Sequence, residues 1–395
     1  MTRFTLDGRE VEAAPGETIW SVAQRVGTDI PHLCHLPKPG YRADGNCRAC
    51  LVEVEGERAL VASCIRTPRD GMAVHSATAR AEAARRMVFE LLLADMPGPE
   101  GRDRSAPFAR WAAKLGVTQS RFAADGRPAP DHSHPAMAVA LDACIACGLC
   151  ERACREVQHN DVIGLARRGA AVTVAFDLLD PMGVSSCVGC GECVQACPTG
   201  ALLPKRVLDD GGCRAGAPAQ EVASVCPYCG VGCQVGFRVR DGRIEEVVGR
   251  DGPSNRGRLC VKGRFGFDFL THPDRLTRPL IRIDGAAKDP ADCLEPARAR
   301  AKFREATWEE ALTRAAGDLR MIRDGIGTQA LAGFGSAKGS NEEAYLFQKL
   351  VRTGFGTNNV DHCTRLCHAA SVTALLEGIG SGAVTAPFTA VAEAD

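Results

Sequence analysis

The sequence predicts a multidomain chain of mixed α+β and α/β character, and three observations lead to this. Its 395 residues correspond to two or three domains at roughly 150 residues each. The composition, 45% hydrophobic and 24% charged, is that of ordinary folded protein. Twenty cysteines stand in tight groups, a pattern that favours metal binding over disulfides or core filling.

Charge and hydropathy exclude two broad function classes. Lys plus Arg equals Asp plus Glu at 48 each, so no net field gathers nucleic acid. No run of 18 apolar residues occurs, and the first residues lack the apolar core of a signal peptide, so we expect no membrane insertion and a cytoplasmic protein. A reducing cytoplasm keeps thiols free, which again favours metal ligation.

Residues 1–76 are predicted to form a small β-grasp-like domain. Strands at Arg3–Leu6 and Glu10–Ala13 flank the turn signal Asp7-Gly8, and a helix is expected from Thr18 to Val26. Four cysteines follow with 12, 2 and 13 residues between them, namely Cys34, Cys47, Cys50 and Cys64. A C-x2-C pair with remote partners suits a 2Fe-2S cluster, and a zinc ribbon is the alternative.

Residues 77–136 are predicted to be a helical segment and linker. The pattern is helical from Ala77 to Met96, and Pro97-Gly98-Pro99 ends it. The stretch to Ala136 is rich in Pro, Arg and Ala around a short helix near Phe108–Leu115. No cysteine accompanies the two histidines at its end, His132 and His134, so no metal is assigned to them.

Residues 137–208 contain an internal repeat of C-x2-C-x2-C-x3-C, the pattern of a two-cluster 4Fe-4S ferredoxin. In that pattern the fourth cysteine of each run serves the other cluster. Zinc is the weaker alternative, because zinc usually takes paired cysteines. One departure is Arg155, which stands where the second run has Pro198. The predicted ligand sets are Cys144, Cys147, Cys150 with Cys197, and Cys187, Cys190, Cys193 with Cys154.

Residues 219–275, after a Gly-rich joint, hold a fourth set of thiols. Two strands, Gln234–Arg240 and Arg243–Val248, are predicted around Asp241-Gly242. By spacing alone the cysteines suit zinc or a 4Fe-4S cluster. They are Cys226, Cys229, Cys233 and Cys260.

Residues 276–395 alternate helices and strands, as the beginning of an incomplete parallel α/β domain does. The expected elements are helix Trp308–Asp324, strand Ala330–Phe334, helix Glu342–Thr353 and strand Asn359–Asp361, with an approach to a further strand near the end. The Gly333-Phe334-Gly335 spacing does not match a nicotinamide-binding loop. A helix start near Asn341 offers amide groups to an anion.

Two of these regions resemble known families. Asp44-Gly45-Asn46-Cys47-Arg48-Ala49-Cys50 resembles the N-terminal 2Fe-2S domain of the large iron-sulfur subunit of respiratory complex I and of soluble formate dehydrogenases. Cys226–Cys233 with Arg258-Leu259-Cys260-Val261-Lys262-Gly263 resembles the N-terminal 4Fe-4S domain of molybdopterin oxidoreductases. That resemblance implies that Lys262 lies between cluster and pterin and helps to carry electrons.

The segments Gly335–Glu342 and Gly356–His368 resemble formate dehydrogenases. The resemblance implies that Cys367 ligates molybdenum or tungsten held by two molybdopterin guanine dinucleotides, and that His368 lies beside the substrate. The predicted pterin contacts are Gly335, Ser336, Asn341, Lys262 and Cys367. Here Ala369-Ala370 follows the histidine where relatives often have Gly-Pro, which weakens the assignment of the substrate.

The resemblance implies a catalytic α subunit of a cytoplasmic, NAD-linked formate dehydrogenase. It would use one 2Fe-2S cluster, three 4Fe-4S clusters and the bis-pterin metal to oxidise formate to carbon dioxide, with a flavin- and NAD-binding diaphorase subunit as partner. We expect these 395 residues alone to be inactive. One alternative is a non-catalytic electron-transfer subunit, like that of complex I or a hydrogenase diaphorase. Another is a related pterin enzyme such as nitrate reductase.

Overall fold

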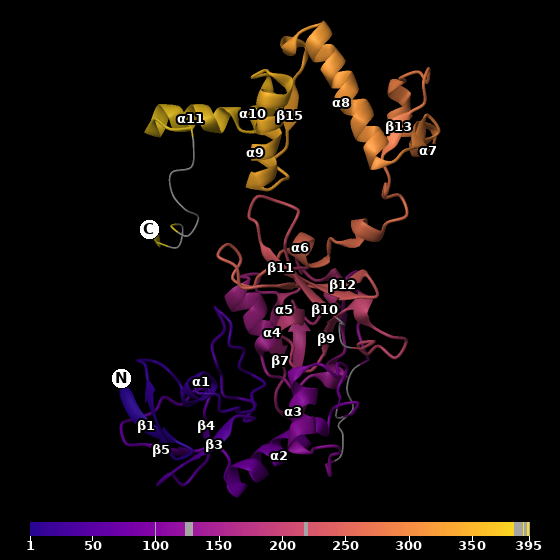
Figure 1. Ribbon diagram of the computed structural model, residues 1–395. Helices are drawn as coiled ribbons and strands as arrows, with labels where there is room; N and C mark the ends of the chain where they lie inside the picture. The colour runs from indigo at the N-terminus through magenta and orange to yellow at the C-terminus, as the bar shows by residue number, and fades with distance from the viewer. Residues whose placement is uncertain (99, 123–128, 217–219, 383–389, 391–392, 395) are drawn as a thin grey trace. The chain divides into compact units, whose positions relative to one another are not determined.

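The computed structural model describes residues 1–98, 100–122, 129–216, 220–382, 390 and 393–394 (Figure 1). The chain divides into two compact units. Unit 1 comprises Met1–Cys226 and Cys233–Phe267, and unit 2 comprises Pro227–Gly232 and Asp268–Asp395. The predicted approach to a strand near the end of the chain falls largely outside the described residues.

Unit 1 begins with a five-stranded sheet in the order β2-β1-β5-β3-β4, packed on helix α1. The first hairpin forms as predicted, because Asp7 and Gly8 adopt the positive φ angles (50° and 79°) of a tight turn. The Thr18 side chain caps α1 by accepting from the Ser21 amide. The bounds are β1 Thr2–Leu6, β2 Arg9–Ala13, α1 Ile19–Arg25, β3 Leu51–Val54, β4 Val61–Ala62 and β5 Ala73–His75.

Two helices cover the next part of unit 1. Helix α2 spans Ala79–Leu93 and helix α3 spans Pro107–Leu115. They meet through Phe89 and Phe108, whose stacked rings lie 5.4 Å apart. Both rings are fully buried, so these helices form a small core of their own beside the cysteine-rich loops.

The repeated cysteine runs form one module of unit 1. Each run ends in a short helix, α4 Leu149–Arg152 or α5 Glu192–Ala196. Two antiparallel strand pairs frame the runs. These are β6 Met137–Val139 paired with β9 Leu202–Pro204, and β7 Ile163–Ala166 paired with β8 Thr173–Phe176.

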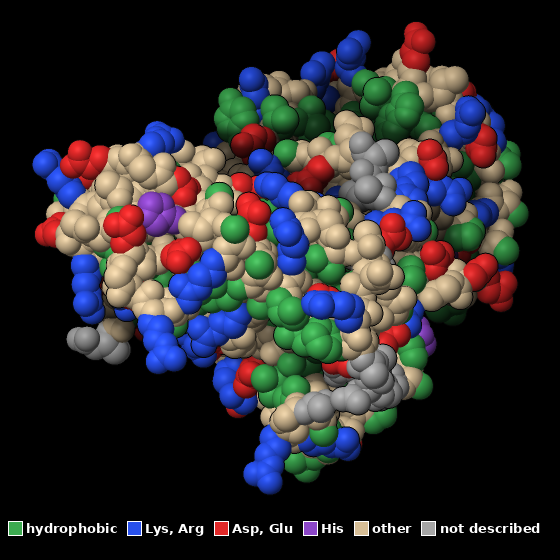
Figure 2. All heavy atoms as spheres, turned by 90° about the horizontal axis from the view of Figure 1, so that it is seen from below, with side chains coloured by type: hydrophobic (Ala, Val, Ile, Leu, Met, Phe, Trp, Pro, Cys, Tyr) green, Lys and Arg blue, Asp and Glu red, His purple; other side chains and the backbone are tan. Residues whose placement is uncertain are grey.

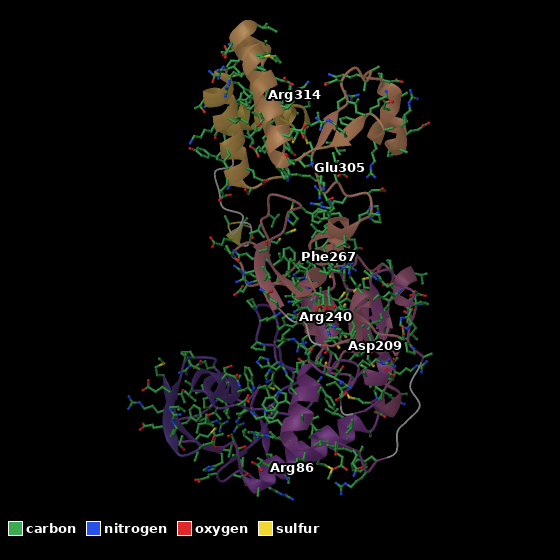
Figure 3. The ribbon with its side chains drawn as sticks, turned by 45° about the vertical axis from the view of Figure 1, so that its right-hand side comes forward. Arg86, Asp209, Arg240, Phe267, Glu305 and Arg314 are labelled. Carbon is green, nitrogen blue, oxygen red and sulfur yellow. The ribbon has the colours of Figure 1, made fainter. Side chains whose placement is uncertain are left out.

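Unit 1 ends with an antiparallel sheet, β10 Gln220–Val225, β11 Gln234–Arg240 and β12 Arg243–Gly249, followed by α6 Val261–Phe265. The β11-β12 hairpin is placed as predicted. Phe267, labelled in Figure 3, packs with Val235, Val247 and Leu259 in the core of this part. Arg206 lies over the Phe267 ring at 5.0 Å.

Unit 2 begins with an antiparallel pair, β13 Leu280–Arg282 and β14 Phe303–Glu305, with α7 Pro296–Arg300 between them. Strands β15 Gly333–Gly335 and β16 Val360–His362 then pair in parallel, as the predicted α/β domain requires. The remaining helices are α8 Trp308–Gly325, α9 Asn341–Lys349, α10 Thr364–Cys367 and α11 Ala369–Ile379.

Two predicted elements of unit 2 have different bounds. Strand β15 begins at Gly333, because Thr328–Ala330 form a 3-10 turn. The Asn359 side chain donates to the Gln329 carbonyl within this turn and to the Leu331 carbonyl after it. Gly333 lies so close to the π-helical turn that follows α9 that an added Cβ would stand 2.4 Å from Val351. The helix predicted to Thr353 is α-helical only to Lys349 and continues as a π-helix, Leu350–Phe355.

The surface agrees with the balanced composition. The face in Figure 2 shows Lys and Arg side chains interspersed with Asp and Glu side chains. Within the described residues, no helix has the length and apolar character needed to cross a bilayer.

Candidate cluster-binding and catalytic sites

The four thiols of the first set converge in unit 1. Cys34, Cys50 and Cys64 are buried, and Cys47 is partly buried. Hydrogen bonds from the Cys47 and Cys64 thiols lower the pKa of Cys34, and a bond from Cys64 lowers the pKa of Cys50. The Cys34 amide also donates to Cys47 Sγ at 3.4 Å. These contacts bring all four predicted 2Fe-2S ligands together.

The second set surrounds one small cavity. Cys144, Cys147 and Cys150 of the first run and Cys197 of the second run all line it, together with apolar side chains such as Leu141 and Val174. Burial raises the pKa of Cys147 and of Cys150 well above that of a free thiol. Such thiols ionise when a cationic metal binds them. The fourth cysteine thus comes from the opposite run, as the crossed pattern requires.

The third set gathers in the same manner. Burial raises the pKa of Cys193, and the charges of Cys190, Cys187 and Cys154 raise it further. The Val162 amide donates to Cys154 Sγ at 3.4 Å. Cys154 of the first run therefore lies among the three cysteines of the second run.

The repeat also shares its backbone geometry. The amides of Ala146 and Gly189, each two residues after the first cysteine of a run, donate to that cysteine's Sγ at 3.4 Å. Gly148 and Gly191 then adopt left-handed φ angles of 72° and 69° before the helices begin. Two equivalent loops thus fold around two equivalent sets of thiols.

A buried arginine, Arg152, lies between the first and second sets. Its Nη2 donates to the carbonyl oxygen of Cys34 at 2.8 Å and to that of Cys147 at 3.3 Å. Its Nη1 pairs with Asp44. The Asn46 side chain donates to the same Cys147 carbonyl at 3.2 Å. The two ligand sets are therefore joined directly.

A second buried arginine, Arg264 of α6, joins the third set to the segment that follows Cys260. Its Nε donates to the Cys190 carbonyl at 3.2 Å, and its Nη2 pairs with Glu192 at 3.1 Å. The Tyr41 hydroxyl donates to the same carboxylate at 2.9 Å. Burial lowers the pKa of Arg264, and the charge of Glu192 opposes that shift.

Unsatisfied donors gather at the cysteine loops, as expected of loops that bind an anionic group. Within the described residues, six buried side-chain atoms lack a hydrogen-bond partner. Five of them are imidazole or guanidinium nitrogens within two residues of a predicted ligand or, for Arg85, bonded to the backbone beside Cys50. They belong to His35, Arg66, Arg85, Arg152 and Arg258. An iron-sulfur core with four thiolates is anionic, so the donor set fits it.

Over the described ranges, no three His, Cys, Asp or Glu side chains meet the geometry of a site for a single metal ion. The four thiolates of an iron-sulfur core are divided among two or four iron atoms, so no single iron binds more than two of them. The fit of these loops to clusters therefore rests on the convergent thiols and the unsatisfied donors described above.

The cysteines of the fourth set belong to both units, with three in unit 1 and one in unit 2. In unit 1 the Cys226 amide donates to the Cys233 carbonyl at 2.8 Å, and Cys226 Sγ lies 3.5 Å from where a Cβ on Gly263 would stand. Cys260 precedes α6, whose second residue is Lys262. Cys229 belongs to unit 2. The structure thus places Cys226 beside the helix that carries Lys262.

Unit 2 holds a pocket of about 690 Å³ at the carboxyl ends of β15 and β16. Gly335 and Ser336 line it, with Lys338 and His362 beside them. Asn341 is not among the residues that line it. A capping box at the start of α9 already occupies the Ser340 and Glu343 amides. The pocket volume is within the usual range for a small-molecule or cofactor site.

Cys367 and His368 lie shortly after β16. Cys367 ends α10, and His368 is the residue before α11, so both occupy the junction of two helices. Both side chains are exposed. Cys363, one helical turn before Cys367, accepts a hydrogen bond on Sγ from the Ala337 amide of the pocket loop at 3.2 Å.

Several residues were absent from the sequence-based site. Arg152, Arg264 and Glu192 are buried charges whose partners are distant in the sequence. The duplication itself carried one signal. Glu192 follows Cys190-Gly191 in the second run, and Leu149 stands at the equivalent position, after Cys147-Gly148, in the first run. A buried carboxylate at only one of two repeated positions indicates a local partner.

Four segments match known families. Residues 1–79 match a 2Fe-2S iron-sulfur cluster binding domain, and residues 140–201 match a 4Fe-4S dicluster domain. Residues 219–272 match the molybdopterin oxidoreductase Fe4S4 domain, and residues 275–395 match molybdopterin oxidoreductase. The chain therefore carries segments similar to iron-sulfur domains and to molybdopterin oxidoreductases. The fold class predicted from the sequence is confirmed.

Three relatives have different described activities. The α subunit of NADPH-Fe(3+) oxidoreductase from Geobacter sulfurreducens is 33% identical over 99% of this chain and 44% of its own length. A component of NADH-quinone oxidoreductase from Rhizobium meliloti is 34% identical over 92% and 40%. The α subunit of F420-dependent formate dehydrogenase 2 from Methanococcus maripaludis is 41% identical over 44% and 23%. The chain spans less than half the length of these relatives.

One solved structure also matches. A chain of an NAD+-reducing [NiFe]-hydrogenase in the H2-reduced state is 30% identical, with a TM-score of 0.47, over 52% of this chain and 87% of that chain.

Proposed function

We propose that this chain acts in a formate dehydrogenase, as part of its catalytic α subunit. Formate would be oxidised to carbon dioxide, with release of two electrons and one proton. One observation carries the proposal: Cys367 and His368 lie together at the α10-α11 junction, shortly after His362, which lines the β15-β16 pocket in the segment that matches molybdopterin oxidoreductase. The relative from Methanococcus maripaludis is described as a formate dehydrogenase subunit, which supports the substrate.

The residues of unit 2 would divide the work at the catalytic site. A molybdenum or tungsten bis-pterin centre, when bound, supplies two-electron oxidation. Cys367 would hold the metal, since a soft thiolate suits it. His368 would orient formate or hold the released proton, because imidazole exchanges protons near neutral pH. Gly335 and Ser336 would contact the pterin with their backbone in the pocket.

Unit 1 would carry the electrons away one at a time. Each iron-sulfur cluster accepts a single electron. The first and second sets share Arg152, and the second and third sets share the crossed cysteines Cys154 and Cys197. Arg264 continues the contacts from the third set to α6, where Lys262 would stand between the fourth cluster and the pterin. A flavin- and NAD-binding subunit is the proposed acceptor.

The test uses the full-length protein with its partner subunits, prepared anaerobically. Formate-dependent dye reduction is measured for the native protein, for Cys367→Ser and for Cys363→Ser. We expect Cys367→Ser to lose activity by a factor of 100 or more while its iron-sulfur spectra stay unchanged. Cys363→Ser is the matched control and should keep most activity. A Cys367→Ser protein with full activity would contradict the metal-ligand role.

A non-catalytic electron-transfer chain is the second candidate. The match to the NADH-quinone oxidoreductase component from Rhizobium meliloti, over 92% of this chain, favours it. Such a chain needs the cysteine sets of unit 1 and has no use for Cys367. Elemental analysis of the full-length protein separates the two functions, since only the enzyme requires molybdenum or tungsten.

A further inference from the structure

Arg152 holds a charge in the interior of unit 1 at the place where two ligand sets meet. Its side chain is 3% exposed. One of its nitrogens, Nη2, bonds the backbone of Cys34 from the first set and of Cys147 from the second. The guanidinium is therefore next to a ligand of both predicted clusters and is shielded from water.

The charge of Arg152 is only partly balanced. Its carboxylate partner, Asp44, also pairs with Arg42, so one carboxylate is shared by two guanidinium groups. Arg42 is 62% exposed and has a second partner, Glu156, at 2.9 Å. Arg264, which is also buried, differs because it has the buried Glu192 at 3.1 Å. Of these two buried arginines, Arg152 retains the more positive surroundings.

We propose that Arg152 raises the reduction potentials of the two clusters that it joins, those of Cys34, Cys47, Cys50, Cys64 and of Cys144, Cys147, Cys150, Cys197. Reduction adds one negative charge to a cluster, and a nearby buried cation stabilises that charge. Arg152 is a positioning residue with an electrostatic effect, and it takes part in no bond change.

The inference rests on the proposed electron-transfer function, because it requires clusters at these cysteines. It does not depend on formate as the substrate. Iron content and electron paramagnetic resonance (EPR) spectra of the native protein test the clusters themselves. Native protein without iron-sulfur signals would overturn the proposed function and this inference together.

The specific test is EPR-monitored potentiometry on the full protein with its partners. Arg152→Gln removes the charge and leaves Asp44 its pair with Arg42. We expect both cluster midpoints to fall by about 59 mV, which is a tenfold change in a one-electron equilibrium. Arg152→Lys should restore most of the shift. Arg42→Gln leaves Asp44 to pair with Arg152 alone, so both midpoints should fall as well, but by less than in Arg152→Gln, because Arg42 is 62% exposed.

Asp44→Asn provides a second test, which applies even if the Arg152→Gln protein does not bind its clusters. It removes the negative partner and keeps the arginine, so both midpoints should rise. Two results would overturn the proposal. One is an unchanged pair of midpoints in an Asp44→Asn or Arg152→Gln protein with native iron content. The other is an Arg152→Lys protein with midpoints as low as those of Arg152→Gln.

Discussion

Arg214 donates from Nε to the carboxylate of Asp103 at 2.8 Å, in the interior of unit 1. Its Nη2 also donates to Glu246 of β12 at 3.2 Å. All three side chains are nearly fully buried. Through Arg214, these ion pairs therefore link the segment before α3 to the last sheet of unit 1.

We expect Asp103→Ala to destabilise unit 1 by about 3 to 5 kcal/mol, since the buried Arg214 would keep only Glu246, whose charge Arg238 already shares. Asp103 also accepts from the Ser105 amide and hydroxyl, and these bonds would be lost too. The thermal unfolding midpoint at a fixed scan rate measures the effect. Glu100→Ala is the control, because its pair with Arg104 is exposed and should contribute less than about 1 kcal/mol.

Local patterns predicted much of unit 1. The Asp7-Gly8 turn and the helix expected from Thr18 depend on neighbours within a few residues, and each lies within one residue of its predicted place. Turn chemistry and ligand spacing are properties of short segments. Sequence reasoning is therefore dependable for these features.

The buried ion pairs could not be predicted in this way. Asp44 and Arg152 are 108 residues apart in the sequence, and Asp103 and Arg214 are 111 apart. From the sequence alone, each of these residues would be expected on the surface, because Asp and Arg side chains are mostly exposed. Only the folded backbone shows which charges share an interior.

The crossed ligation of the ferredoxin module gives a second prediction. Cys197→Ala should remove the cluster of Cys144, Cys147 and Cys150, which lies beside the first set through Arg152. Cys154→Ala should remove the other cluster instead. In the reduced protein, magnetic coupling to this neighbouring cluster should broaden the 2Fe-2S EPR signal. The broadening should disappear in Cys197→Ala and remain in Cys154→Ala. Broadening lost in Cys154→Ala instead would mean that each run binds its own cluster.

Gly191 supports a third prediction, because two costs combine there. Its φ of 69° disfavours any side chain, and an added Cβ would lie 2.9 Å from both Arg264 and Phe265. We expect Gly191→Ala to lower the iron content of the third set and to destabilise unit 1 by about 2 to 4 kcal/mol. Gly8→Ala is the matched control, with a φ of 79° and open space around it. Equal unfolding midpoints for the two variants would show that the contact with α6 is unimportant.

His134 gives a fourth prediction, which concerns pH dependence. The ring is buried, and its Nδ1 accepts from the amides of Ala136 and Met137 at 3.1 and 3.2 Å, so the neutral form is needed. Burial and the charge of Lys205 lower the pKa of His134 below 6.5, against the opposing charge of Asp131. As the pH falls below 6.5, the unfolded chain therefore takes up a proton that the folded chain resists, and stability decreases. Thermal midpoints between pH 8 and pH 5.5 should show this loss in the native protein and a smaller loss in His134→Gln. The exposed neighbour His132 is the control, because His132→Gln should keep the native pH profile, and identical profiles for all three proteins would exclude His134 as the source.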